Sequence, residues 1–195
     1  MIGYPNAKPR MNISSVKSSA SNRGMSLEKD LNQTNSYYLQ LDRAVIYKKP
    51  TPVQIVNVDY PKRSAAKITE AYFKVPSTTD YNGVYKGYAV DFEAKETKTK
   101  TSFPFKLIHP HQIEHLQRVI RHGGIGFLII RFTHYDETYY IEAQKMIDAY
   151  TNRDHQSLPY SWFKENGYLI PFSLTPPVDY LKIIDQYILK EVKYE

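Results

Sequence analysis

Apolar positions recur with a helical period in several parts of the chain. Residues 25–39 and 110–122 each place apolar side chains on one side, and Ser26 can cap the first of these helices. A short helix is expected at 145–150. A final helix is expected to begin at Thr175, with an apolar face formed by Val178, Leu181, Ile184 and Ile188.

Shorter apolar runs predict strands between these helices. The expected strands cover residues 43–47, 53–58, 67–75, 79–84, 89–95, 126–132 and 138–143. Lys86-Gly87 signals a tight hairpin turn between the fourth and fifth of them. This order of elements predicts an α/β or α+β sheet sandwich, and 195 residues are enough for one domain, or for one domain with a tail.

Composition restricts the classes of function. With 26 basic and 20 acidic residues, the net charge of +6 favours a polyanionic partner. The absence of Cys excludes a disulfide framework, a thiolate nucleophile and Cys-ligated metal sites. The longest apolar run, 126–130, is far shorter than the roughly 20 residues of a membrane helix, and the N-terminus lacks a signal-peptide pattern. We therefore expect a soluble, cytoplasmic protein that does not contact a membrane.

The positive charge is clustered. Residues 1–27 carry four basic residues and no acid, in a Ser-rich and Asn-rich context typical of a flexible arm. Between residues 43 and 74, seven basic residues face two acidic ones, and further Lys residues lie between 95 and 106. Clustered charge suits nucleic acid, because each phosphate contact releases counterions. The alternative is a solubilising tail and an ordinary solvated surface.

One strand pattern points to chemistry. In Asp91-Phe92-Glu93-Ala94-Lys95, the three charged side chains project from one face of the expected strand. If residues 79–84 and 89–95 form a hairpin, Asp80 and Glu93 converge near its open end. Two carboxylates suit Mg²⁺, and a neighbouring Lys can stabilise charge on phosphorus. A surface strand with a plain Glu–Lys pair explains the spacing equally well.

A second pattern offers a different class of enzyme. His111, Glu114 and His115 fit H-x-x-E-H, in which two His residues on one helical face bind Zn²⁺. The pattern needs a third ligand downstream, and no supporting motif accompanies any acidic residue there. The plainer interpretation is a polar helix face that directs Gln112 toward the expected catalytic sheet.

Several longer blocks resemble the RecU family, the Holliday-junction resolvases of Gram-positive bacteria and mollicutes. The similarity covers roughly residues 22–130, in the blocks NRGMSLEKDLN (22–32), KKPTPVQIVNVDYPKRSAA (48–66), EAYFK (70–74), STTDYNGVYKG (77–87), DFEAKETK (91–98), KTSFP (100–104) and HPHQIEH (109–115). The N-terminal arm and the C-terminal third match more loosely.

This resemblance implies a restriction-endonuclease-like fold, with a central mixed β-sheet flanked by helices, a projecting stalk and a flexible basic N-terminal arm. It divides the chain into an arm (1–24) and a nuclease domain (25–195) with a stalk insertion at about 48–67. It implies that Thr78, Asp80, Glu93 and Gln112 bind Mg²⁺, for which Mn²⁺ can substitute, and that Lys95 stabilises the transition state.

The resemblance also extends to supporting residues and partners. Glu28 and Asp91 are expected to support the acidic site. The residues expected to bind DNA are Arg23, Lys48, Lys49, Lys62, Arg63 and Lys98. The implied function is Mg²⁺-dependent resolution of four-way DNA junctions by paired nicks in recombination, repair and chromosome segregation. The protein would act as a homodimer and would also modulate RecA. The alternative is a non-catalytic junction-binding and RecA-modulating protein.

Overall fold

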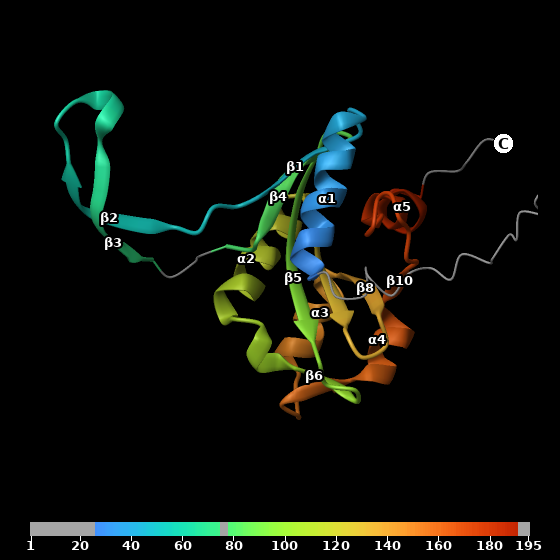
Figure 1. Cartoon of the computed structure of the whole chain (residues 1–195). Coiled ribbons are helices and arrows are strands. Elements are labelled where there is room, and N and C mark those ends of the chain that lie inside the picture. The colour runs from blue at the N-terminus through green and yellow to red at the C-terminus, as the bar shows by residue number, and fades with distance from the viewer. Residues whose placement is uncertain (1–25, 75–77, 191–195) are drawn as a thin grey trace, which may run out of the picture.

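The computed structural model describes residues 26–74 and 78–190. The expected arm (1–24), including Arg23, lies outside these residues. The body of the protein is built on a six-stranded sheet in the order β1-β4-β5-β7-β8-β10 (Figure 1). Its strands are β1 (Val45–Lys48), β4 (Tyr81–Tyr85), β5 (Tyr88–Thr97), β7 (Ile125–Phe132), β8 (Glu137–Glu142) and β10 (Tyr168–Ile170). Only β5 and β7 pair in parallel, so the sheet is mixed, as expected.

Helices cover both faces of the sheet (Figure 1). The covering helices are α1 (Leu27–Gln40), α2 (Pro110–Arg121), α3 (Ala143–Thr151), α4 (Tyr160–Asn166) and α5 (Tyr180–Ile183). Strand β7 is buried throughout and separates two apolar cores, because its successive side chains point to opposite faces. Phe127 and Ile129 pack in the core that contains α1 and α5, and Leu128 and Ile130 pack in the core that contains α2, α3 and α4. The expected α/β class is therefore confirmed.

A tight turn sets the register of the β4–β5 hairpin. Lys86 and Gly87 both adopt positive φ, 48° and 82°, as a two-residue turn of this kind requires. At the other edge of β4, Gly83 lets β1 approach closely, since a Cβ there would lie 2.0 Å from Val45 O. The register is therefore fixed on both sides of β4, the strand that begins directly after Asp80.

A separate two-stranded sheet projects away from the body (Figure 1). Strands β2 (Val53–Asp59) and β3 (Lys67–Phe73) pair antiparallel and are exposed along their whole length. A 3₁₀ turn, η2 (Arg63–Ala65), lies at the tip. We call residues 49–74 together with residues 78–80 the stalk and its roots. Strand β3 begins at Lys67, so the projecting sheet extends beyond residue 67, the expected end of the stalk insertion.

The C-terminal segment completes the core beneath β5. The Tyr180 ring lies 5.1 Å from the Phe92 ring and 5.6 Å from the Phe127 ring, measured between centroids. The expected helix start at Thr175 is wrong, because α5 begins only at Tyr180 and continues as a π-helical turn, η4 (Ile184–Ile188). Tertiary hydrogen bonds occupy the preceding residues: Val178 N donates to Thr34 Oγ1, and Tyr38 Oη donates to Asp179.

Small elements that the pattern did not predict close one end of the body. Strands β6 (Ser102–Pro104) and β9 (Ser157–Pro159) form a second two-stranded sheet, and a 3₁₀ turn, η3 (Phe105–Leu107), follows β6. In the described part of the chain, no helix is both long enough and apolar enough to cross a bilayer.

Candidate active site

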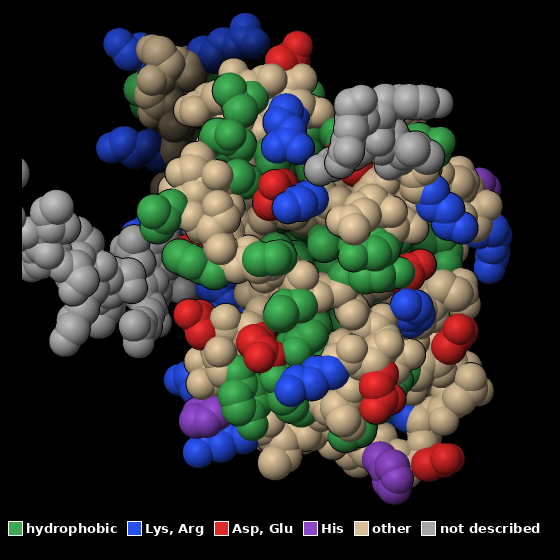
Figure 2. Space-filling view, turned by 90° about the vertical axis from the view of Figure 1, so that its right-hand side faces the viewer, with side chains coloured by type: hydrophobic (Ala, Val, Ile, Leu, Met, Phe, Trp, Pro, Cys, Tyr) green, Lys and Arg blue, Asp and Glu red, His purple; other side chains and the backbone are tan. Residues whose placement is uncertain are grey.

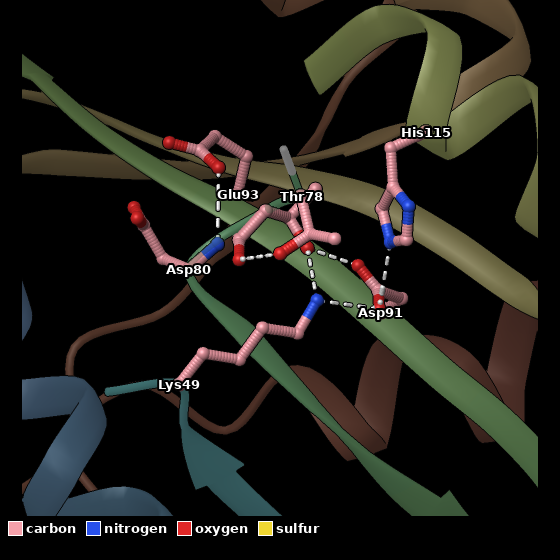
Figure 3. A network of polar contacts seen from close by, with 7 residues as sticks. Lys49, Thr78, Asp80, Asp91, Glu93 and His115 are labelled. Atoms are coloured by element: carbon pink, nitrogen blue, oxygen red, sulfur yellow. Dashed lines mark hydrogen bonds and ion pairs between the residues drawn. The ribbon is translucent and has the colours of Figure 1, made fainter. Parts of the chain in front are cut away.

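The open end of the β4–β5 hairpin brings the two predicted carboxylates together. Tyr81 pairs with Phe92, so the next position along each strand places Asp80 opposite Glu93. The backbone N–H of Asp80 donates to Glu93 Oε2 at 3.1 Å (Figure 3). The convergence that the sequence spacing predicted is therefore present, and it follows from the tight turn at the other end of the hairpin.

Glu93 is a buried carboxyl group in an unfavourable electrostatic position. Its side chain is fully buried, and burial raises its pKa to about 8, with Asp80 adding to the effect and Lys95 opposing it. Lys95 Nζ lies 2.6 Å from Glu93 Oε1 and forms an ion pair with it. Further positive charge at this point would favour the ionised form of Glu93.

A cavity of about 200 Å³ opens beside these residues. It is lined by Leu27, Glu28, Lys48, Asp80, Tyr81, Ala94, Lys95 and Glu96. Glu28, a predicted supporting acid, stands at the N-terminal end of α1 and pairs with Lys48 at 2.6 Å. Both side chains are substantially exposed, so the pair can open to a ligand at little cost. The cavity is therefore lined by both acidic and basic side chains.

Asp91, the other predicted supporting acid, anchors a separate network on the same face of β5. Its Oδ2 accepts a hydrogen bond from Lys49 Nζ at 2.9 Å and lies 3.1 Å from His115 Nε2. Thr79 Oγ1 donates to its other oxygen and accepts from Lys49 Nζ at 3.1 Å. In Figure 3, Lys49 and His115 are turned toward Asp91, whereas the Asp80 side chain points away from it.

The other two predicted metal ligands, Thr78 and Gln112, each have a local hydrogen-bond partner. Thr78 is half-buried and donates to the carbonyl oxygen of Thr79. Gln112 is buried in the first turn of α2, where its Oε1 accepts a hydrogen bond from His109 N at 2.9 Å. This contact is part of a capping box, so the structure gives Gln112 a role in starting α2.

The predicted DNA-binding residues fall into two groups. Lys62, Arg63 and Lys98 are exposed, the first two at the tip of the stalk. Lys48 pairs with Glu28, and Lys49 points inward to Asp91, with a side chain that is only 19% exposed. The surface positions of Lys62 and Arg63 suit contacts with DNA phosphates. The inward position of Lys49 suits a contact within the protein.

The zinc alternative is not supported. His115 faces Asp91, while Glu114 lies on the surface of α2 and pairs with Arg118 at 3.5 Å. Throughout residues 26–74 and 78–190, no group of three or more His, Asp or Glu side chains is placed to hold a metal ion. Asp80 and Glu93 carry two carboxyl groups on adjacent segments of the chain, and oxygen ligands of this kind suit a hard cation.

Sequence reasoning missed Thr79, and it considered His115 only as a zinc ligand. Both contact Asp91 only because β4, β5 and α2 meet in three dimensions. The sequence carried one hint, since Thr78-Thr79-Asp80 is a polar run directly before a strand. Nothing in the sequence distinguished Lys49 from the exposed Lys48 beside it.

Comparison with known proteins places the chain in a family. Residues 22–186 match the family described as RecU: Recombination protein U. The chain belongs to the RecU family. It is 53% identical over 193 residues to the Holliday junction resolvase RecU of Oceanobacillus iheyensis, covering 95% of this chain and 98% of that protein. It is 51% identical over 203 residues to the Holliday junction resolvase RecU of Staphylococcus aureus, covering 97% and 98%.

One solved structure with a similar backbone is that of Archaeoglobus fulgidus Hjc, a Holliday junction resolvase from an archaeal hyperthermophile. The alignment covers 71% of this chain and 90% of that one, at 11% sequence identity and a TM-score of 0.41. The RecU assignment confirms the resemblance carried by the sequence blocks, and it extends the match through the C-terminal third to residue 186.

Proposed function

We propose that this protein is a Holliday junction resolvase, an endonuclease that cuts four-way DNA junctions. The observation that carries the proposal is the placement of Asp80, Glu93 and Lys95 at the open end of the β4–β5 hairpin in a chain of the RecU family. This arrangement of two carboxylates and a Lys on a mixed sheet is the one expected of restriction-endonuclease-like nucleases. The protein would resolve junctions during homologous recombination, DNA repair and chromosome segregation.

The site fits a divalent cation held by oxygen ligands, Mg²⁺ or in its place Mn²⁺. Asp80 and Glu93 would supply carboxylate oxygens. Burial raises the pKa of Glu93, and a bound cation would lower it and so favour the carboxylate form. Thr78 would add its hydroxyl, and Gln112 the second lone pair of Oε1. When bound, the cation supplies Lewis acidity and lowers the pKa of water.

Lys95 is suited to stabilise the charge that develops on the phosphoryl oxygens. Its ammonium lies 2.6 Å from Glu93 Oε1 and lines the cavity, with about a fifth of its side chain exposed. A cation preorganised in a partly dehydrated site stabilises a developing anion more strongly than one in bulk water. The same pairing opposes the rise in the pKa of Glu93 that burial causes, and so favours its carboxylate form.

The stalk is the part of the described chain best suited to enter the junction. Its tip carries Lys62 and Arg63, both exposed, and the elongated hairpin extends well away from the body (Figure 1). By contrast, the side of the molecule at the right of Figure 1 mixes acidic, basic and apolar side chains (Figure 2). Lys98, which is exposed just after β5, would add a further phosphate contact, as would Arg23 of the expected arm.

A homodimer is the assembly that fits both the task and the stalk. Symmetric nicks in a four-way junction require two active sites related by a two-fold axis. An isolated two-stranded hairpin is at best marginally stable, and this one exposes many apolar side chains. The exposed apolar side chains of β2 and β3 are Val53, Ile55, Val56, Val58, Ile68, Tyr72 and Phe73. A second copy of the stalk would cover them. Modulation of RecA remains a prediction from the family resemblance.

A cleavage assay tests the proposed function. A synthetic four-way junction, labelled in turn on each strand, is incubated with the protein with and without Mg²⁺, alongside a linear duplex of the same sequence. We expect metal-dependent nicks at symmetric positions in the junction and little cutting of the duplex. Glu93→Ala and Lys95→Ala should abolish cleavage and leave junction binding largely intact. Glu114→Ala, an exposed change on α2, is the matched control and should cut normally.

The results separate the possible outcomes. Undiminished nicking by Glu93→Ala or Lys95→Ala would refute the assigned site. A junction that is bound by the wild type and remains uncut with either Mg²⁺ or Mn²⁺ would favour a non-catalytic junction-binding protein instead.

A further inference from the structure

Both roots of the stalk are attached to one side chain. Lys49 directly follows β1, where the chain leaves the body for the stalk, and Thr79 directly precedes Asp80 and β4, where it returns. Lys49 Nζ and Thr79 Oγ1 each donate to a different oxygen of Asp91, and Lys49 also donates to Thr79 (Figure 3). Asp91 thus connects the outgoing and the returning chain. We call these three residues the root clamp.

The root clamp lies between two separate backbone ladders. The hydrogen bond from Lys74 N to Pro52 O, 3.0 Å long, marks the base of the stalk ladder. The bond from Lys49 N to Asp80 O, 2.8 Å long, continues the ladder of the body past the end of β1. Side-chain contacts to Asp91 therefore act at the place where stalk and body join.

Asp91 also belongs to the elements that hold the proposed catalytic residues. It precedes Glu93 by two positions on β5 and faces the same way, and Thr79 is the neighbour of both Thr78 and Asp80. His115, which lies 3.1 Å from Asp91, stands three residues after Gln112 on α2. A displacement of the stalk roots would therefore also move the segments that carry the four proposed metal ligands.

The contacts are strong enough to transmit such a displacement. Asp91 is 7% exposed, and a carboxylate at this depth requires charge-assisted partners. Lys49 supplies the opposite charge, and its own side chain is 19% exposed. An ion pair this buried holds its geometry better than a surface pair does.

We propose that Asp91 and Lys49 are positioning residues that couple the seating of the stalk in a DNA junction to the placement of Asp80 opposite Glu93. The proposal rests on the proposed function. It assigns Lys49 an internal role in place of a DNA contact, and it makes the rate of cleavage, not the affinity for the junction, depend on the root clamp.

Single-turnover cleavage with saturating protein tests this split. We expect Asp91→Asn and Lys49→Met to slow cleavage by about 10- to 100-fold, the range that misplacement of catalytic groups produces. The Kd for the junction, measured in Ca²⁺ without cleavage, should stay within about threefold of wild type. Because both variants break the same contact, the double variant should be little slower than either single one. Lys49→Arg should recover part of the rate.

A matched control separates coupling from general loss of stability. Asp30→Asn disrupts a comparably buried ion pair, Asp30–Arg131 at 2.6 Å, on the α1 side of the body. It should leave the single-turnover rate near that of wild type. If Asp30→Asn slows cleavage as much as Asp91→Asn does, or if Asp91→Asn and Lys49→Met cut at the wild-type rate, the proposal is overturned. Should Asp91→Asn fail to fold, Lys49→Met decides.

A distance measurement tests the clamp without DNA cleavage. Since the chain has no Cys, spin labels can be attached at Ser64→Cys in the stalk tip and Asn152→Cys after α3, both exposed. Dilution with unlabelled protein restricts the signal to one protomer. Asp91→Asn and Lys49→Met should broaden the distance distribution, and an unchanged distribution would overturn the coupling even if cleavage slowed. If the wild type cuts no junction, the proposed function fails, while this measurement still decides the clamp.

Discussion

The burial of Glu93 makes a quantitative prediction about stability and pH. In the unfolded chain this carboxyl group has its ordinary pKa of 4.5, and in the folded, metal-free protein burial beside Asp80 raises the pKa to about 8. Between these values the unfolded chain has lost a proton that the folded protein retains. Unfolding therefore releases a proton, and the free energy of unfolding falls as the pH rises.

The size of the effect follows from the two pKa values. Each pH unit between them corresponds to about 1.4 kcal/mol, so the full loss above pH 8 is about 5 kcal/mol. Between pH 5 and pH 8 the contribution of Glu93 amounts to about 3 to 4 kcal/mol, which is an upper figure because local rearrangement and water entry reduce it. Below pH 4.5 the loss vanishes. Glu93→Gln removes the titrating group and should remove this slope.

Urea denaturation of both proteins from pH 5 to pH 8 in EDTA measures the effect. The quantity to compare is the change in unfolding free energy with pH, because the contributions of titrating groups that do not interact with Glu93 cancel between wild type and variant. We expect Glu93→Gln to become progressively more stable than wild type as the pH rises. Parallel curves for the two proteins would refute the reasoning, since Glu93 would then titrate with nearly the same pKa in both states.

Three further predictions concern the metal, the arm and the core. A fixed Mg²⁺ concentration, ten times the Kd at pH 8, should stabilise the wild type by about 1.4 kcal/mol in thermal unfolding at pH 8 and by less at pH 6. It should not stabilise Glu93→Gln, and equal shifts in both proteins would place the ion elsewhere. Removal of residues 1–21 should weaken junction binding and flatten its dependence on salt in titrations at several ionic strengths, whereas an unchanged slope would make the arm only a solubilising tail. Asp30→Ala should lower the unfolding free energy by about 3–5 kcal/mol, because the Arg131 guanidinium then stays buried without this carboxylate, and a loss under 1 kcal/mol would contradict that view.

The parts of the structure that the sequence predicted depend on local signals. The hairpin turn at Lys86-Gly87 and the alternation along Asp91–Lys95 are short-range patterns, and together they were sufficient to place Asp80 opposite Glu93. The apolar run of β7 likewise identified the central buried strand. Such patterns survive folding because the backbone geometry of a strand and of a two-residue turn is the same in any protein.

The parts that were missed depend on contacts between distant segments. Lys48 and Lys49 are adjacent identical residues, and only the tertiary position of Asp91 turns the second one inward. The residues after Thr175 have a helical pattern, yet hydrogen bonds to α1 hold them out of the helix until Tyr180. In both cases, partners about 40 to 140 residues away in the chain determine the outcome, and periodicity carries no information about them.

The position of Tyr180 has a consequence for the synthesis of this protein on the ribosome. Its ring packs against Phe92, the residue that separates Asp91 from Glu93 on β5, and its neighbours Leu181 and Ile184 are fully buried in the same core. A nascent chain that ends before these residues lacks the support beneath the strand that carries Glu93. During synthesis, the strand that carries Glu93 therefore gains this support only after residues 180–184 have left the ribosome.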